Sequence, residues 1–496
     1  MKKMSIIPLY LLILLFAFIA CEDNRELDIP ADQFVIINSG VKEISLFAQS
    51  ESASEIIAIG KGGLGTLSGN VRLTIDEGLV EDYNAKHSTN YKAMPTNVFS
   101  LDKTELHFDA DDANHFLTLS LNIKELVALQ GIRVKKYVIP IKLTSTDAVE
   151  VNQKHASLIL IPEIKGGIRQ GSGKILWERK LQADLNIQSL HVTGGIAVTD
   201  DYLVLNTRNE PCIYLDRLTG EKIGTMPNME SIIGGVTNFY TTSDSKGNIL
   251  ISNLAPNAGS FKVWKFKDVN ASPEILIDWS ESGGYAVGRK ISVQGDVDNN
   301  AIITAAILGD KNQFARWQVK EGKFVSKTPE IVNITGLEGV WWNNADIVST
   351  ESNNSKSDYF LACYTPPWKF AWVDGKDNNI KAWGPERSPN WIPNAVDYTI
   401  FNHCPYLVVN SISPWNWGRD DIVYLYDASS ETSITEPIWS SPEGIYGGFE
   451  NGGQNLNATG DVLLKVSDDG NYMHLYFMFT NGCVVCVQFD CKDTTE

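Results

Sequence analysis

The stretch from Tyr406 to Asp427, YLVVNSISPWNWGRDDIVYLYD, places two strand-like runs on either side of a turn-rich segment. YLVVNS and IVYLYD are rich in the β-branched and aromatic residues that strands favour. The segment between them contains Ser, Pro, Asn, Gly and Asp, which are loop formers, and yet it carries Trp415 and Trp417. The stretch therefore predicts a pair of neighbouring strands joined by a loop with two large aromatic side chains.

This pair of strands recurs through the C-terminal two thirds of the chain. Six second members of the pair read CIYLD, KVWKF, ARWQV, FAWVD, IVYLY and VVCVQFD, and they are marked by Tyr214, Trp264, Trp317, Trp372, Tyr424 and Cys486. Successive markers are 50, 53, 55, 52 and 62 residues apart. A period of this length is typical of a four-stranded propeller blade, so we expect six blades, with seven open if two have been merged.

A propeller also needs an outer strand in every blade and a closed ring. The first five repeats continue into EKIGTM, EILIDWS, TPEIV, IKAWG and PIWSS, whereas the sixth has no further strand before Glu496. KILWERKL, residues 174–181, precedes the first repeat and can complete the last blade. Closure of this kind removes the exposed edges of an open sheet. The sequence therefore predicts a β-propeller over residues 175–496, with its last outer strand from 174–181.

The N-terminal part has a different pattern. Eight alternating or apolar runs between residues 28 and 164 indicate an antiparallel, immunoglobulin-like β-sandwich: QFVIINS, VKEISLFAQ, SEIIAIGK, NVRLTID, TELHFDA, FLTLSLNI, YVIPIKLT and ASLILIPEI. One short helical insert, EGLVEDYNAKHST, interrupts them. A glycine-rich linker, KGGIRQGSGK, covers 165–174. The predicted fold class is thus all-β, with a sandwich followed by a propeller.

The insert and the segment after it carry a resemblance to a known family. GLVEDYNAKHSTNYKAMPTNVFSL, followed by YVIPI, resembles an N-terminal sandwich domain of unknown function through Gly78, Leu79, Val80, Tyr83, Asn84, Tyr91, Pro95 and Phe99. That domain occurs in lipoproteins of bacterial polysaccharide-utilisation systems and in front of some family 18 glycosidases. The resemblance covers roughly 140 residues and supplies no catalytic residues. It implies a setting in glycan use without a particular chemistry.

The first residues predict export and lipid anchoring. Two lysines precede an apolar run that ends before Cys21, which is the layout of a secretory signal over 1–20 and is too short for a transmembrane helix. FAFIAC resembles a bacterial lipobox, although Phe18 replaces the usual Leu. The acidic tether 21–27 resembles the surface-export signal of Bacteroidota lipoproteins. We expect lipidation at Cys21 and an outer-membrane protein that faces the cell exterior. An ordinary cleaved signal with an incidental Cys21 is the alternative.

Charge and cysteine content narrow the choice of partners. A net charge of −18 without a basic stretch argues against nucleic acid or an anionic membrane surface and fits a neutral ligand such as a glycan. Cys483 and Cys486 lie in an apolar strand without a nearby His, so the cysteines are interpreted as structural. GDVDNN, residues 295–300, lacks the later Glu of a calcium loop and is interpreted as a turn. No cofactor or metal is expected.

The tryptophans divide between strands and loops. Seven of the thirteen fall in predicted third or outer strands and are expected to pack between blades: Trp177, Trp264, Trp279, Trp317, Trp372, Trp383 and Trp439. The other six fall in second-to-third strand loops or in connections between blades, which open on one face of a propeller: Trp341, Trp342, Trp368, Trp391, Trp415 and Trp417. Aromatic side chains gathered on one face indicate an interaction surface. The alternative is that they fill the channel or pack against the sandwich.

The polar residues of these loops suit a sugar, because a flat ring can lie under its C–H face while amides and charged groups bind its hydroxyls. They are Arg208, Asn209, Glu210, Asn257, Asn343, Asn344, Arg419, Asp420 and Glu450. The leading hypothesis is a surface module that binds a carbohydrate for an outer-membrane uptake system. A glycoside hydrolase or lyase remains an alternative, with Glu210, Asp420, Asp421, Glu450 and, more weakly, Asp397 as acids. A protein-interaction propeller is the third.

Overall fold

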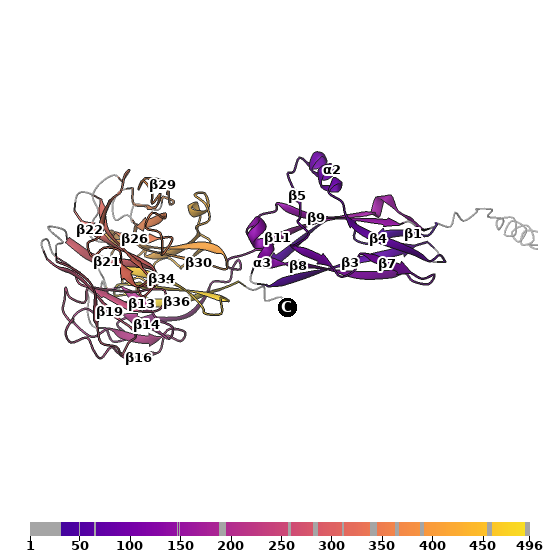
Figure 1. The fold of residues 1–496 in the computed structure, drawn as a ribbon. Helices are drawn as coiled ribbons and strands as arrows, with labels where there is room; N and C mark the ends of the chain where they lie inside the picture. Colours follow the sequence, from indigo (N-terminus) through magenta and orange to yellow (C-terminus); the bar gives the residue numbers. More distant parts are fainter. Residues whose placement is uncertain are drawn as a thin grey trace, which may run out of the picture. The chain divides into compact units, whose positions relative to one another are not determined.

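The computed structural model describes residues 31–491 apart from 49, 64–65, 146, 148, 188–194, 256–258, 281–285, 310–311, 338–344, 363–366, 387–390 and 454–458. The chain divides into two compact units, residues 1–165 and 166–496 (Figure 1). The signal segment, the tether and Cys21 lie outside the described residues. Within those residues, no helix has the length and apolarity needed to cross a membrane.

The first unit is a sandwich of two sheets. One sheet has the order β10 (Glu150–Val151), β1 (Gln33–Ile36), β3 (Ser52–Gly62), β8 (Asn114–Asn122) and β6 (Phe99–Leu101). The other has the order β2 (Gly40–Phe47), β11 (Ser157–Lys165), β9 (Tyr137–Ser145), β4 (Gly69–Ile75) and β7 (Glu105–Phe108), with β5 (Lys92–Ala93) beside β9. All eight predicted strands are present.

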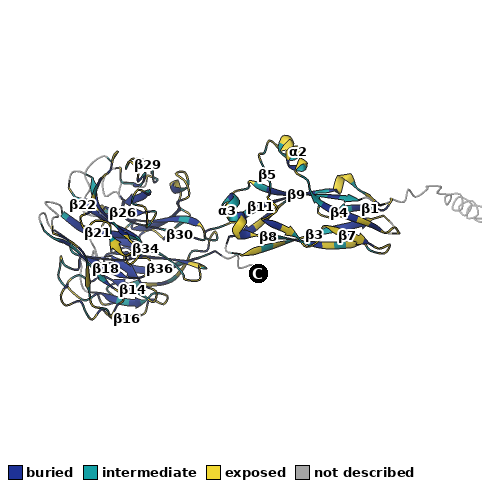
Figure 2. Ribbon diagram, viewed as in Figure 1, coloured by how far each residue is buried: buried dark blue, intermediate teal, exposed yellow. Residues whose placement is uncertain are grey.

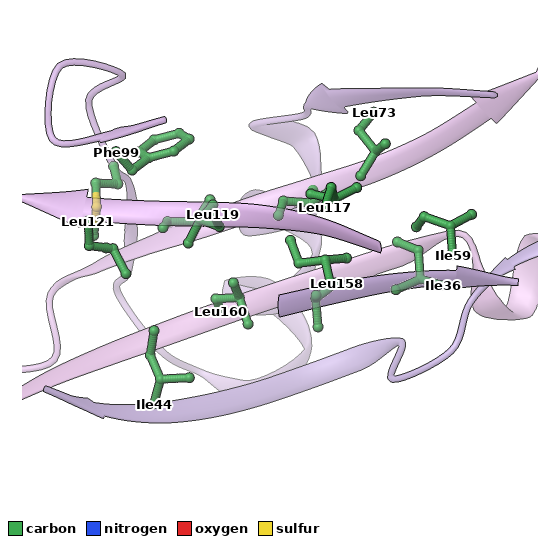
Figure 3. Packing of buried hydrophobic residues seen from close by; sticks show 14 of the residues in the cluster. Ile36, Ile44, Ile59, Leu73, Phe99, Leu117, Leu119, Leu121, Leu158 and Leu160 are labelled. Carbon is green, nitrogen blue, oxygen red and sulfur yellow. The ribbon is translucent and has the colours of Figure 1, made fainter. Parts of the chain in front are cut away.

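The sandwich core forms because alternate residues of each strand point inward. In β8, Leu117, Leu119 and Leu121 are buried, while the residues between them are at least partly exposed. Figure 3 shows these leucines meeting Leu158 and Leu160 of β11 in the space between the sheets. The core therefore runs through both sheets, as a two-layer fold requires.

Two details of this unit differ from the sequence prediction. The sheets are not wholly antiparallel, because β2 pairs with β11 and β1 with β10 in parallel. A second helix, α3 (Ile123–Gln130), joins the expected α2 (Gly78–His87). The α3 helix begins where the Asn122 side chain accepts a hydrogen bond from the Glu125 backbone N–H, and it buries Ile123 and Leu126. It is too short, and too close to an apolar strand, for its periodicity to stand out.

The second unit is a propeller of six blades. The first three blades consist of β13 (Ile196–Val198), β14 (Tyr202–Leu205), β15 (Ile213–Asp216) and β16 (Lys222–Thr225); β17 (Tyr240–Ser243), β18 (Ile249–Ser252), β19 (Phe261–Phe266) and β20 (Glu274–Trp279); and β21 (Ala286–Gly295), β22 (Ala301–Leu308), β23 (Gln313–Lys320), β24 (Lys323–Phe324) and β25 (Glu330–Asn333).

The remaining blades are β26 (Asp346–Ser349), β27 (Tyr359–Ala362), β28 (Phe370–Val373) and β29 (Ile380–Trp383); β30 (Ile392–Phe401), β31 (Cys404–Ile412), β32 (Ile422–Asp427) and β33 (Trp439–Ser440); and β34 (Gly460–Val466), β35 (Tyr472–Phe479) and β36 (Cys483–Asp490), completed by β12 (Lys174–Lys180). Figure 2 shows that most residues of the propeller strands are buried.

The ring is closed at both its inner and its outer edge. Each innermost strand contacts the next one around the ring, in the order β13, β17, β21, β26, β30 and β34. The ring closes because β34 contacts β13. At the rim, β12 pairs antiparallel with β36, from Lys174 opposite Gln488 to Lys180 opposite Cys483. The sequence pattern predicts this strand at 174–181, in agreement with β12. The last blade is thereby held by a segment from the other end of the unit, which removes an open edge.

The segment before β12 lies on the propeller. The Gly167 backbone N–H donates to the Asn402 carbonyl at 2.9 Å, and the Ile168 backbone N–H donates to the Tyr406 hydroxyl at 2.7 Å. The Arg169 guanidinium forms an ion pair with Asp490 at 2.8 Å. These contacts involve the hairpin turn between β30 and β31 and the end of β36. Residues 167–169 are thus fixed at the face where the first and second strands of each blade are joined.

Candidate functional site

Two faces of the propeller follow from its topology. The hairpin face carries the turns between first and second strands, and the opposite face carries the second-to-third strand loops and the connections between blades. We call the latter the mouth face. Its described loops include 206–212, 226–239, 413–421 and 441–453. Loops supported by a rigid scaffold are where binding residues usually lie.

The mouth loop 413–421 is held by hydrogen bonds within itself. The buried Asp421 carboxylate accepts the Ser413 backbone N–H at 2.8 Å, and the Ser413 hydroxyl accepts the Asp420 backbone N–H at 3.0 Å. Asn416 donates its amide to the Asp420 carboxylate at 2.6 Å. Burial raises the pKa of Asp421 to about 7, against the lowering effect of its hydrogen bonds to Ser413. The loop therefore has one defined conformation before any ligand arrives.

This conformation presents both tryptophans of the loop to solvent. Trp415 is 61% exposed and lies in the single 3₁₀ turn η2 (Pro414–Asn416), and Trp417 is 45% exposed. The backbone of Trp417 is left-handed, with φ of 60°, and so is that of Trp368, with φ of 59°. A bulky side chain in this conformation costs about 1 kcal/mol or more and is found where function requires it. Large exposed aromatics on a fixed loop indicate a binding surface.

Trp391 supports the loop from below. It is half-buried against the core between the fourth and fifth blades, and its indole N–H donates to the Asp420 carbonyl at 2.7 Å. This hydrogen bond fixes the end of loop 413–421, so Trp391 acts as a positioning residue. The sequence pattern could not separate these roles, because both kinds of tryptophan occur in turn-rich segments.

The mouth face has further apolar exposure in two connections between blades. Val236, between the first and second blades, is 57% exposed, and Ile445, between the fifth and sixth, is 56% exposed. The guanidinium of the exposed Arg419 lies 3.8 Å from the centre of the Phe449 ring, a cation–π contact across two mouth loops. Arg419 thus offers hydrogen-bond donors next to the tryptophans.

A second arginine–aromatic group joins two mouth loops, 206–212 and 226–239, to strand β21 of the third blade. The Arg208 guanidinium is 4.0 Å, and the Arg289 guanidinium 5.7 Å, from the centre of the Phe239 ring. Burial and the neighbouring charge of Arg289 lower the pKa of Arg208. Phe239 and Arg289 were missed from the sequence, because their proximity depends on the order of the blades around the ring.

The other predicted mouth residues have simpler positions. Asn209, Glu210 and Glu450 are exposed, and Asp420 and Trp368 are half-buried. The Glu210 carbonyl accepts the Asn238 side-chain amide at 3.1 Å, which fixes its loop. Outside the described residues lie Trp341, Trp342, Asn257, Asn343 and Asn344. Of the seven strand tryptophans, three are buried and four are half-buried between or at the edges of blades.

Near the mouth ends of the inner strands, side chains from four blades meet across the axis and form what we call the axial plug. Lys290 of β21 donates to the Gly460 carbonyl of β34 at 2.8 Å, and its ammonium lies 3.9 Å from Asp461. The Tyr240 hydroxyl donates to Asp461 at 2.7 Å. Asp346 accepts the Ser292 hydroxyl at 2.5 Å and the Val396 backbone N–H at 3.1 Å.

The axial plug contains two buried carboxyl groups, Asp461 and Asp346, and one ammonium group, Lys290. Burial raises the pKa of Asp461 to about 6, with Lys290 acting against the rise, and raises that of Asp346. Asp397, which was a weaker acid candidate for the mouth, lies in β30 below the plug, and burial raises its pKa to about 8. Among the described residues, no group of three or more His, Cys, Asp or Glu is arranged to hold a metal ion.

The fold and the mouth define an all-β protein with a sandwich unit and a six-bladed propeller that exposes aromatics on one face. A family model described as a domain of unknown function, DUF8500, matches residues 180–490, more than half of the chain. The chain belongs to the DUF8500 family. A second family model, for an N-terminal domain, matches residues 31–150. No curated protein sequence matches the chain.

A solved structure shares the fold at low identity. A DUF4623 family protein from Bacteroides eggerthii is 12% identical, with a TM-score of 0.52 over 92% of this chain and 97% of that chain. Two weaker likenesses carry no argument. A putative carbohydrate binding protein from Bacteroides ovatus has 9% identity and a TM-score of 0.24 over 73% of this chain and 93% of its own. EndoBT-3987 from Bacteroides thetaiotamicron, with a Man5GlcNAc product, has 15% identity and a TM-score of 0.21 over 25% and 28%.

Proposed function

We propose that the protein binds a carbohydrate on the mouth face, as a lipid-anchored surface protein of a glycan-uptake system. The observation that carries the proposal is the exposure of Trp415 and Trp417 on a loop that internal hydrogen bonds already fix. Ordering two bulky side chains in advance lowers the entropy cost of binding a ligand. The apolar C–H face of a sugar ring can lie on an indole.

Polar groups around the tryptophans suit sugar hydroxyls. Arg419 supplies donors beside them, and Asn209, Glu210 and Glu450 supply exposed amide and carboxylate groups on other mouth loops. Asp421 lies under the loop, and its carboxylate accepts both hydrogen bonds that Ser413 donates, so its role there is to hold the loop and not to react. These observations support binding over cleavage.

The test is a panel of polysaccharides applied to the chain from residue 22 onward, by affinity gel or glycan array. We expect at least one glycan to bind, and the double variant Trp415→Ala, Trp417→Ala to lose at least 30-fold in affinity, because stacked aromatics are typical hot spots. Tyr472→Ala is the matched control, since this exposed aromatic lies at the hairpin face. Binding that survives the double variant, or a panel without any ligand, refutes the proposal. Cleavage of a bound glycan would favour a hydrolase.

Anchoring has its own test. In a Bacteroidota host, the intact chain is expected to incorporate a fatty-acid label and to be digested on whole cells by added protease. Cys21→Ser is expected to abolish the label, because the thiol at this position is the acceptor that the lipobox resemblance implies. A label that persists in Cys21→Ser contradicts lipidation at this residue.

A further inference from the structure

The channel of the propeller has a cavity at the end opposite the mouth. It has a volume of about 290 Å³ and is lined by residues at the ends of five of the six inner strands, among them Val198, Ser243, Gln294, Thr399 and Leu464. These strand ends lead into the turns of the hairpin face. We call it the axial cavity. Its volume is at the lower end of the range of small-molecule sites.

The axial plug separates this cavity from the mouth. Lys290 and Tyr240 reach Gly460 and Asp461 at the start of β34, whereas the cavity is lined by Leu463 and Leu464 further along that strand. Two to four residues of strand separate these contacts from the cavity lining, which corresponds to about 7–13 Å. The axial cavity is therefore a site of its own and not the floor of the mouth.

Polar groups in the axial cavity are available to a ligand. Gln294 and Thr399 line it, and in the part of the chain that the structure describes, neither side chain forms a hydrogen bond. Asp397 also lines it and accepts only backbone N–H groups, that of Leu464 at 2.6 Å among them. Burial, with Asp346 and Asp461 nearby, raises the pKa of Asp397 to about 8, which favours the neutral carboxyl. An amide, a hydroxyl and a carboxyl thus converge on the cavity.

The charged residues at the edge of the cavity are already compensated. The Lys465 ammonium lies 3.1 Å from Asp200 and donates to the Ser245 carbonyl at 3.2 Å. The Asp244 carboxylate accepts the backbone N–H of Asn248 at 2.9 Å and that of Val297 at 3.0 Å. An ionic ligand would have to displace these contacts, and a buried unpaired charge is costly. The cavity therefore favours a neutral guest.

Apolar side chains complete the lining. Val198, Val293 and Leu463 belong to three different inner strands. A ligand with hydroxyls at its edge and C–H groups on its faces matches both kinds of wall. We propose that the axial cavity binds a small neutral polyhydroxylated molecule the size of one sugar ring, independently of the mouth.

The test uses the chain from residue 22 onward, with both units, and ligand-observed NMR against glucose, mannose, N-acetylglucosamine and inositol. We expect at least one of them to bind. The double variant Gln294→Ala, Thr399→Val should weaken binding at least tenfold, while Trp415→Ala with Trp417→Ala leaves it unchanged. This second variant distinguishes the axial cavity from the glycan site proposed for the mouth.

Circular dichroism and melting temperature provide the folding control. If the double cavity variant is less stable than the parent, Asp397→Asn, which keeps the size of the side chain, replaces it and is expected to alter affinity at least threefold. The proposal is overturned if none of the four compounds binds, or if binding is lost with the tryptophans and survives the cavity variants. The proposal is supported if the cavity variants lose binding of the small compound and keep binding of the polysaccharide.

Discussion

The two ends of the propeller axis are built on the same strands but differ in structure: one exposes aromatic side chains on a loop, and the other encloses a cavity. At the mouth, loop 413–421 keeps Trp415 and Trp417 exposed because buried hydrogen bonds beneath them determine its conformation. At the hairpin end, short polar turns surround a cavity lined by Asp397, whose pKa burial raises to about 8. The axial plug lies between them. The comparison teaches that strand repetition builds the scaffold, while individual buried polar groups make each end distinct.

Removing the central cation should have the largest effect. Lys290→Met leaves the buried Asp461 and Asp346 without their compensating charge, so we expect the free energy of unfolding at pH 7 to fall by about 3–5 kcal/mol. Urea unfolding at pH 7 and pH 5 measures this. The loss should be smaller at pH 5, because the carboxylates protonate. Equal losses at both pH values would contradict the assignment of Lys290 as the balancing charge.

The raised pKa values predict an unusual dependence of stability on pH. Asp461, Asp421 and Asp397 have folded pKa values of about 6, 7 and 8, above the value near 4 of an unfolded Asp. Between pH 4 and 8 the folded state binds more protons than the unfolded state, so stability decreases as pH rises. We expect the free energy of unfolding to be several kcal/mol lower at pH 8.5 than at pH 5, measured by urea titration.

A single variant assigns part of this dependence. Asp397→Asn removes the group with the highest pKa and should flatten the curve between pH 6.5 and 8.5, while Asp420→Asn, on the mouth, serves as the control. A wild-type protein that is more stable at pH 8.5 than at pH 5 would contradict the raised pKa values, because a carboxyl with a lowered pKa, such as Asp76, changes stability only below about pH 5.

Releasing the mouth loop should have an intermediate effect. Asp421→Ala leaves the Ser413 backbone N–H buried without its acceptor, which costs about 1–3 kcal/mol. Limited proteolysis should then cleave within 413–421 faster than in the parent, and glycan affinity should fall. Glu450→Ala, an exposed mouth acid, is the control and should not change proteolysis. Unchanged cleavage in Asp421→Ala would mean that the loop is held by other contacts.

The smallest effect is expected at the edge of the aromatic surface. Arg419→Ala removes one cation–π contact with Phe449, worth about 0.5–1 kcal/mol, and its donors for a ligand. Thermal melting should change little, while glycan affinity should fall several-fold. Arg419→Lys keeps the charge but not the planar group, and should recover only part of the affinity. A variant Arg419→Ala with full affinity would restrict the binding surface to the tryptophans.

Much of the fold could be predicted because it depends on local patterns. Alternation placed the eight sandwich strands, and the spacing of Tyr214, Trp264 and the later markers gave the six blades. The α3 helix was missed because one short amphipathic segment beside a strand gives little periodic signal. The parallel pairing of β2 with β11 was missed because alternation reports which face is buried and not the direction of the neighbour.

For the candidate sites too, the sequence predicted one part and only the structure shows the other. Residue type and loop chemistry by themselves determined that aromatics would gather in loops that open on one face, and that 174–181 could complete the ring. Only the tertiary structure decided that Trp391 binds the Asp420 carbonyl, that Arg208 and Arg289 share Phe239, and that Lys290 and Asp461 meet across the axis. The last two contacts join residues from different blades, and the burial that shifts the pKa values of Arg208 and Asp461 exists only after the ring has closed.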